Sequence, residues 1–238
     1  MRKILTATAL AVVLVYGCIQ GAMWQYDRYQ VRHAKNALII ANVNKPALDE
    51  AQLNNLSDSR RAWRETEVTG SFITAKEILV RNRYHEGKYG FGVITLFKSE
   101  QGKFYWVDRG WVIAGKDATT PPITTPVTGD KVEILARVRI ANIENQIAGS
   151  VFAVPNGKDG KQLEKWNETG SVTTQDFYLD LISTSNSQFD PEVPSTLPEI
   201  SDGPHLAYSL QWLIFAFLVV LALFLVIREE RKAQREKL

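Results

Sequence analysis

The chain is poor in the residues that form disulfides and metal clusters. Its 238 residues include one cysteine, Cys18, and three histidines. A single cysteine excludes a disulfide framework and any CxxC thiol or copper motif. His33, His85 and His205 lie far apart in the sequence, whereas a zinc site requires ligands at short, defined spacings. A folded domain in this chain must therefore be held together by its core alone.

Motifs of the common enzyme classes are also missing. The sequence has no GxSxG nucleophile elbow, no HExxH metalloprotease pair and no glycine-rich phosphate loop. Because no nucleophile–base constellation is present, we expect a protein that is not an enzyme. The formal net charge is only +2, and the densest group of positive residues lies at the C-terminus. Nothing in this composition indicates a nucleic-acid partner.

Two long apolar runs are present instead. Residues 206–227 carry no charge and consist mostly of Leu, Ile, Val and Phe. As a helix they would extend ~33 Å, which exceeds the ~30 Å hydrocarbon layer of a bilayer. Residues 4–26 form a weaker run behind Arg2 and Lys3. We expect two transmembrane helices, 4–26 and 206–227, with a cleaved signal peptide or lipoprotein signal as the alternative reading of the first run.

The positive residues after the second run predict the orientation. Segment 228–238 contains Arg228, Arg231, Lys232, Arg235 and Lys237. Positive flanks of membrane spans remain on the cytoplasmic side. The short start Met1-Arg2-Lys3 is typical of a bacterial protein rather than of a mitochondrial presequence. We therefore expect a bacterial inner-membrane protein with both termini cytoplasmic and residues 27–204 in the periplasm.

The segment between the two runs has mostly β periodicity. Residues 24–42 predict a helix that continues the first span, with an apolar stripe at Val31, Ala34, Leu38 and Ala41. Shorter helices are expected over 46–56 and 177–182, and residues 183–204 read as a polar loop. The remaining pattern predicts six strands: 65–72, 77–82, 89–98, 103–113, 132–140 and 151–154. The predicted fold class is an α+β membrane protein, in which two transmembrane helices flank a mostly antiparallel sheet that a small barrel would close.

Charged residues inside the predicted strands have simple structural readings. Asp108 and Arg109 are adjacent in a strand, and we expect a rim ion pair. The Arg81-Asn82-Arg83 segment is read as the solvated end of a strand, and His85 as part of a solvated turn.

His205 differs from the other histidines because it begins the second apolar run. Pro204 suits the first turn of a helix, and residues 201–203 include possible capping groups. Tyr208 and Trp212 follow at i+3 and i+7, on one helix face. Such a face could hold a flat, partly charged molecule, or it could simply anchor the helix at the membrane boundary.

The helix start also affects the chemistry expected of His205. The positive end of the helix dipole disfavours an imidazolium, and the neutral imidazole is the form that ligates metals. The same helix end favours anions, such as the propionates of a porphyrin. The residues alone leave two readings open, a metal ligand and a hydrogen-bonding cap.

An ordered set of short motifs covers nearly the whole chain. These are Trp24-Gln25-x-x-Arg28, Gly70-x-Phe72, Arg81-Asn82-Arg83, Gly90-Phe91-Gly92-Val93-Ile94-Thr95-Leu96, Val107-Asp108-Arg109-Gly110-Trp111-Val112, and His205-Leu206-Ala207-Tyr208 followed by Trp212. In this order they resemble the Surfeit locus protein one family, the assembly factors of haem-copper cytochrome c oxidase. The chain departs from the family pattern at Asp202-Gly203-Pro204, Gly90-Phe91 and Asp108.

The resemblance implies a role in building subunit I of the oxidase, together with other assembly factors and within the lipid bilayer. It implies transient binding of haem a, with His205 as the iron ligand. Tyr208 and Trp212 would pack the porphyrin, and Arg28 or Arg109 would lie near its propionates. The alternative is a membrane-anchored protein–protein scaffold that stabilises an assembly intermediate without binding a cofactor.

Overall fold

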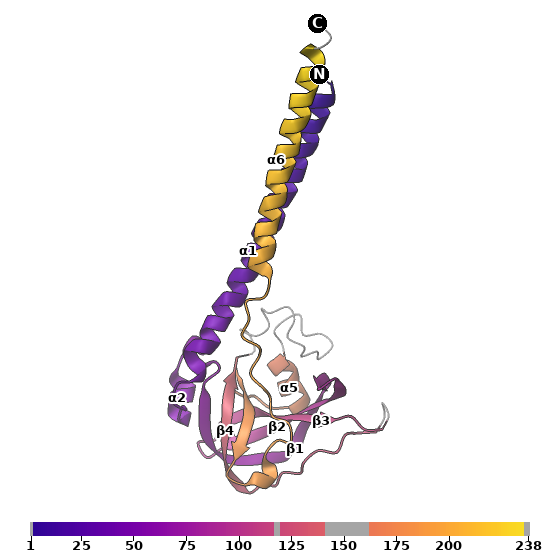
Figure 1. The fold of residues 1–238 in the computed structure, drawn as a ribbon. Coiled ribbons are helices and arrows are strands. Elements are labelled where there is room, and N and C mark those ends of the chain that lie inside the picture. Colours follow the sequence, from indigo (N-terminus) through magenta and orange to yellow (C-terminus); the bar gives the residue numbers. More distant parts are fainter. Residues whose placement is uncertain (1, 117–119, 141–161, 236–238) are drawn as a thin grey trace. The chain divides into compact units, whose positions relative to one another are not determined.

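The computed structural model describes residues 2–116, 120–140 and 162–235. The chain divides into two compact units (Figure 1). One unit is helical and joins the two ends of the chain, Met1–Ala37 and Glu199–Leu238. The other is a β domain formed by Leu38–Pro198.

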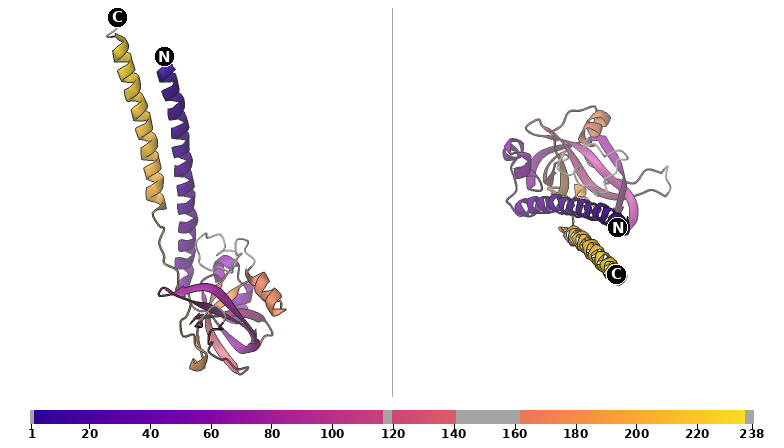
Figure 2. Two further views of the ribbon diagram at one scale, coloured as in Figure 1. Left: turned by 90° about the vertical axis from the view of Figure 1, so that its right-hand side faces the viewer. Right: turned by 90° about the horizontal axis from the view of Figure 1, so that it is seen from above.

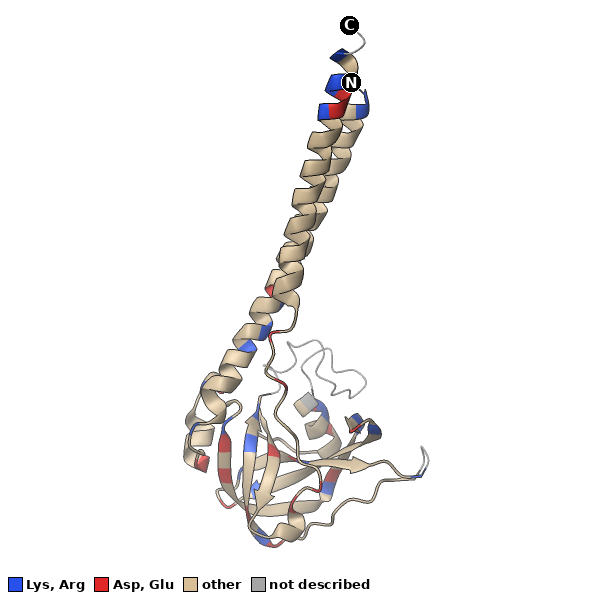
Figure 3. Ribbon diagram, viewed as in Figure 1, with Lys and Arg blue, Asp and Glu red and all other residues tan. Residues whose placement is uncertain are grey.

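The helical unit is an antiparallel pair formed by α6 (His205–Arg235) and the part of α1 (Arg2–Val43) up to Ala37 (Figure 2). Lys3 Nζ lies 3.8 Å from Glu230 Oε1, so the start of α1 is next to the end of α6. Both helices are long and apolar enough to cross a membrane. Charges gather near the chain ends and are missing from the middle of both helices (Figure 3). The two apolar helices predicted at the termini are therefore present.

Helix α1 continues well beyond the first apolar run, as the uninterrupted helical pattern predicted. The predicted apolar stripe is wrong, because Val31, Ala34 and Ala41 are exposed while Ile39 and Asn42 are buried. Asn42 is buried because its side-chain amide donates to the carbonyls of Ser59 and Ala62, at 2.8 and 2.9 Å. A polar residue with two backbone partners thus occupies a position that the hydrophobic pattern could not identify.

Five strands make up the β domain. They are β1 (Glu65–His85), β2 (Lys88–Ser99), β3 (Phe104–Ile113), β4 (Lys131–Arg139) and β5 (Tyr178–Thr184). They close into a barrel in the order β1-β2-β3-β5-β4. Every neighbouring pair is antiparallel except β3 and β5. The prediction of a mostly antiparallel sheet is confirmed.

The barrel core follows from the alternation of apolar residues along the strands. In β4, Val132, Ile134 and Ala136 are buried while Glu133 is exposed. Phe72 of β1 pairs with Phe97 of β2, and their rings meet edge to face at 5.0 Å between centroids. Short helices accompany the strands: α2 (Glu50–Asn55), α3 (Asp58–Arg61), α5 (Gln162–Gly170) and the 3₁₀ turn η2 (Ser187–Phe189).

Two predictions about secondary structure are wrong. The two strands expected over 65–72 and 77–82 are one bent strand, β1, whose register with β2 shifts between Ile73 and Glu77 and again between Val80 and Arg83. The helix expected over 177–182 is strand β5. Residues 178–181 are buried without alternation because both faces of β5 are covered: Leu179 and Leu181 belong to the barrel core, and Tyr178 meets Trp166 of α5 edge to face at 5.3 Å. The strand expected over 151–154 lies outside the described residues.

Candidate functional site

The helical unit is held in register by small residues on α1. Ser209 Oγ on α6 donates to the backbone carbonyl of Ala22 at 2.9 Å, and Ser209 is buried. A Cβ atom added to Gly21 would lie 2.9 Å from the ring of Trp212. The helices can approach this closely only because α1 presents small side chains at the contact.

His205 is the first residue of α6 and contacts α1 directly. Its Nδ1 lies 2.9 Å from Oε1 of Gln25, and the pair is partly buried. The helix starts from Pro204, whose carbonyl accepts from the N–H of Tyr208 at 3.0 Å. Within the described part of the chain, the other ring nitrogen, Nε2, has no hydrogen-bond partner. One side of the imidazole is therefore engaged, and the other is available to a ligand.

The segment before His205 is fastened to α1 by Asp202. Its Oδ2 lies 2.9 Å from His33 Nδ1, and its Oδ1 accepts from Asn36 Nδ2 at 2.8 Å. Hydrogen bonds from His33 and then from Asn36 lower the pKa of the Asp202 carboxyl group, and the charge of Arg32 adds to this effect. The carboxylate considered as a helix cap thus joins the lead-in segment to the other helix instead.

Arg32 is the cation that the structure brings to the histidine. A Cβ atom added to Gly203 would lie 3.3 Å from Arg32 Nη1 and 3.6 Å from Cδ2 of His205. Cδ2 is bonded to Nε2 in the imidazole ring, so Arg32 is near the side of His205 that Gln25 does not engage. Gly203 has a φ of +67°, a conformation that favours glycine and leaves this space open.

The predicted helical residues Arg28, Tyr208 and Trp212 share a unit with His205. The guanidinium of Arg28 lies over the ring of Trp24, 5.6 Å from its centroid. Tyr208 is 47% exposed. Trp212 packs against Gly21 and meets Phe215 edge to face at 5.9 Å, so part of its surface is already used in helix packing.

Arg109 belongs to the other unit, the β domain, where it is buried. Its Nη1 donates to Glu77 Oε2 at 3.1 Å, and its Nη2 donates to the carbonyl of Thr125. Burial lowers the pKa of Arg109, and the charge of Glu77 opposes that shift. Two of the three guanidinium nitrogens, Nη1 and Nη2, thus donate hydrogen bonds to groups of the β domain itself.

The expected rim pair between Asp108 and Arg109 is wrong. Neighbouring residues of a strand point to opposite faces, so each residue pairs with a different partner on β1. Asp108 Oδ2 accepts from Arg83 Nη2 at 2.5 Å, and both side chains are buried. Burial is the largest single influence and would lower the pKa of Arg83, but the charge and hydrogen bond of Asp108, together with the charges of Tyr178 and Asp180, raise it. The reading of Arg83 as a solvated strand end is wrong for the same reason.

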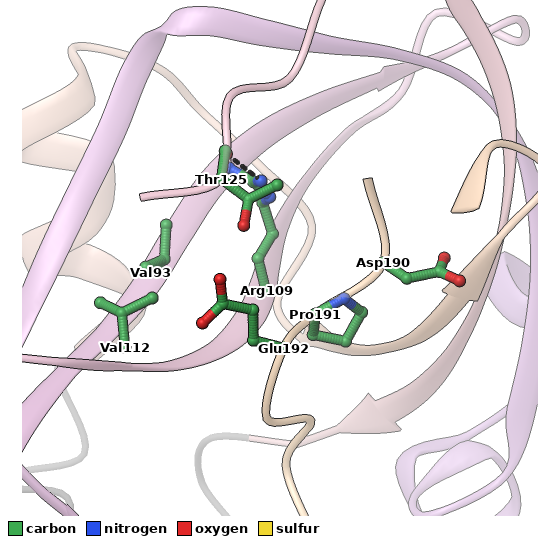
Figure 4. Close-up of a pocket in the computed structure, with 7 residues that line it drawn as sticks. All are labelled: Val93, Arg109, Val112, Thr125, Asp190, Pro191 and Glu192. Atoms are coloured by element: carbon green, nitrogen blue, oxygen red, sulfur yellow. Dashed lines mark hydrogen bonds between the residues drawn. The ribbon is translucent and has the colours of Figure 1, made fainter. Parts of the chain in front are cut away.

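A shallow crevice lies beside Arg109 in the β domain (Figure 4). It is lined by Val93, Arg109, Val112, Thr125, Asp190, Pro191 and Glu192. The carboxylate of Asp190 already accepts a hydrogen bond from the backbone N–H of Thr184, at 2.6 Å. The two carboxylates of the lining disfavour an anionic ligand such as a propionate. No cluster of three His, Cys, Asp or Glu that could hold a metal occurs among the described residues.

The side chains around His205 fit a haem better than this crevice does. A histidine that ligates haem iron requires a neutral imidazole whose second nitrogen is held by a partner, and Gln25 would be that partner. A propionate requires a nearby cation, and Arg32 would supply it. Tyr208, one turn further along α6, adds an exposed aromatic ring.

Sequence reasoning did not nominate Gln25, Arg32 or Ser209 as site residues. The spacing of Gln25 and Arg32 is seven residues, which places them on one face of α1. The sequence shows this shared face, but it does not indicate which face of α1 contacts α6. Only the helix contact identifies these residues.

Comparison with known proteins gives one consistent result. The sequence model of the SURF1 family matches residues 12–217. An uncharacterized SURF1-like protein of Mycobacterium bovis is 30% identical over 243 residues, covering 96% of this chain and 86% of the relative. A SURF1-like protein of Rickettsia felis is 24% identical over 217 residues, covering 86% of this chain and 90% of the relative.

Proposed function

The chain belongs to the SURF1 family, and from this membership we propose that it is a membrane-anchored assembly factor for haem-copper cytochrome c oxidase. It binds haem a at His205 and helps to insert it into subunit I, with other assembly factors as partners. The observation that carries this proposal is the state of His205, held at Nδ1 by Gln25 and without a partner at Nε2 among the described residues. We propose no enzymatic activity.

The roles of the residues follow from their chemistry. With haem bound, His205 would offer the Nε2 lone pair to the iron, and Gln25 would hold the ring. Arg32 would pair with a propionate, with Arg28, one turn earlier on α1, as a second cation. Tyr208 and Trp212 would cover part of the porphyrin. Haem a itself supplies the redox-active iron that the oxidase needs in subunit I.

The direct test is the visible spectrum of the protein purified in detergent from cells that make haem a. We expect a haem spectrum in the unsubstituted protein and its loss in His205→Ala. His85→Ala is the control, because His85 lies in the β domain and not in the helical unit. A folded, unsubstituted protein without bound haem would refute the haem-binding role.

A scaffold without a cofactor is supported by a different observation. On the β domain, Tyr84, Tyr89 and Phe91 form a ladder of edge-to-face rings with successive centroid distances of 5.6 Å. Tyr84 is 61% exposed and the nearby Ile113 is 57% exposed. Exposed apolar surface of this kind is typical of protein–protein contacts. If the scaffold role is correct, His205→Ala will still co-purify with subunit I, whereas Tyr84→Ser will not.

We also propose that both termini are cytoplasmic and that the β domain is periplasmic. The supporting feature is the basic segment after the apolar part of α6. A reporter that is active only in the periplasm should work when inserted within 185–198 and fail when fused after Leu238. The reverse pattern would invert the topology.

A further inference from the structure

We infer that Gln25 is the positioning residue of the haem site: it accepts a hydrogen bond from Nδ1–H of His205 and so keeps Nε2 unprotonated and ready to bind iron. This inference rests on the proposed function, because it names the group that prepares the proposed ligand. It assigns to α1 a part in the site, in addition to its role as an anchor.

Packing of the two helices positions the side chain of Gln25 against His205. Gln25 and His205 are 180 residues apart in sequence, and their side chains meet at 2.9 Å. One turn along the helices, Ser209 donates to the carbonyl of Ala22 at 2.9 Å. This second bond fixes the register of the two helices, so Gln25 faces the imidazole without needing a loop to hold it.

The chemistry of imidazole gives the contact its consequence. A neutral histidine has one protonated and one unprotonated ring nitrogen, and the partner of one nitrogen decides the state of the other. A carbonyl oxygen can only accept, so Gln25 Oε1 requires the proton to be on Nδ1. Nε2 then has a free lone pair, and no proton must leave before a metal binds. A partner at the second nitrogen also orients the ring and raises its basicity.

If the Gln25–His205 contact only joined the two helices, its loss would have a different effect. In that case, losing the Gln25 contact would loosen α1 and α6 but leave the ring nitrogens of His205 without a preferred state. Ser209→Ala is the matched control, because it removes the neighbouring hydrogen bond between the helices and leaves the acceptor of His205 in place.

The first measurement needs no cofactor. Full-length protein with ¹⁵N-labelled histidine is studied by NMR in detergent micelles, and the His205 signals are assigned by their loss in His205→Gln. We expect a protonated Nδ1 and an unprotonated Nε2 in the unsubstituted protein, in Ser209→Ala and in Gln25→Glu. Gln25→Leu should shift the population toward protonated Nε2. An Nε2-protonated ring in the unsubstituted protein would overturn the inference.

The second measurement uses ferrous haem b as the probe, added to the same detergent-solubilised proteins. Loss of a partner of a metal-bound histidine typically weakens binding 10–100-fold, and we expect about this loss in Gln25→Leu but not in Ser209→Ala. Gln25→Glu should bind haem and lower its midpoint potential, because a carboxylate accepts more strongly than an amide. Equal affinity and potential in Gln25→Leu and in the unsubstituted protein would overturn the inference alone. No binding by the unsubstituted protein would overturn the proposed function as well.

Discussion

The two units of the molecule differ in how their polar side chains are paired and buried. In the β domain, Asp108 pairs with Arg83 and Asp180 pairs with Arg139, and all four side chains are buried. In the helical unit, the pair of His33 and Asp202 is partly exposed, and His205 is engaged on one side only. Oppositely charged side chains that pair inside the barrel contribute to the stability of the fold. An imidazole with a partner at only one ring nitrogen can still bind a ligand at the other. This difference supports our proposal that a ligand binds in the helical unit.

The largest expected effect is in the β domain. Asp108→Ala removes the carboxylate that neutralises buried Arg83, and breaking such a buried pair costs about 3–5 kcal/mol of stability. Thermal unfolding of the detergent-solubilised protein should show the loss. The double substitution Arg83→Met with Asp108→Leu should recover most of the stability, because no uncompensated charge is left. A loss below about 1 kcal/mol in the single variant would show that this pair is not what stabilises the barrel.

The next largest effect is expected at the two arginines near His205. Arg32→Ala should weaken haem b binding by about 10–100-fold, since a hydrogen bond to a charged group is worth ~1.5–3 kcal/mol. Arg28→Ala should have a smaller effect, because Arg28 lies over Trp24. Titrations followed by visible absorption provide the comparison. A larger effect from Arg28→Ala would exchange the roles of the two arginines.

Helix packing should respond somewhat less. Gly21→Leu forces a side chain against Trp212, and overpacking of this kind costs about 1–3 kcal/mol. Gly17→Leu is the control, because a Cβ at Gly17 meets nothing within 4 Å. The midpoint of thermal unfolding and the near-ultraviolet signal of tryptophan should change only in the Gly21 variant. Equal behaviour of the two variants would mean that this contact does not set the register.

The smallest effect is the response of Asp202 to acid. Its pKa is lowered in the folded protein by hydrogen bonds from His33 and Asn36. A carboxylate with a lowered pKa stabilises the fold above the ordinary carboxyl range and loses that contribution as pH falls through the lowered value. Below about pH 4, the amide protection factors in segment 199–204, which are corrected for the intrinsic pH dependence of exchange, should fall. Asp202→Asn should make these protection factors nearly independent of pH across the same range.

Features that depend on local pattern were predictable, and features that depend on distant contacts were not. Strands β2, β3 and β4 were predicted to within a residue or two, because alternation is local. The two apolar helices were predicted in place from their apolar runs, although α6 continues to Arg235, eight residues beyond the predicted run. Strand β5 was misread because burial of both of its faces removes alternation. His205 was identified from its place at a helix start. Gln25 and Arg32 were not, because only the contact between α1 and α6 shows which face of α1 is involved.

The parallel pairing of β3 with β5 has a consequence for how the protein is made. Trp106 pairs with Tyr178, so the barrel closes across more than 70 residues of chain. Contacts between such distant segments form slowly. During synthesis, β1 to β4 are complete well before β5 leaves the ribosome, and β3 and β4 then have open edges that can pair with other chains. Only about 20 residues separate the end of β5 from the start of α6, so the strand that closes the barrel and the last helix leave the ribosome at nearly the same stage of translation.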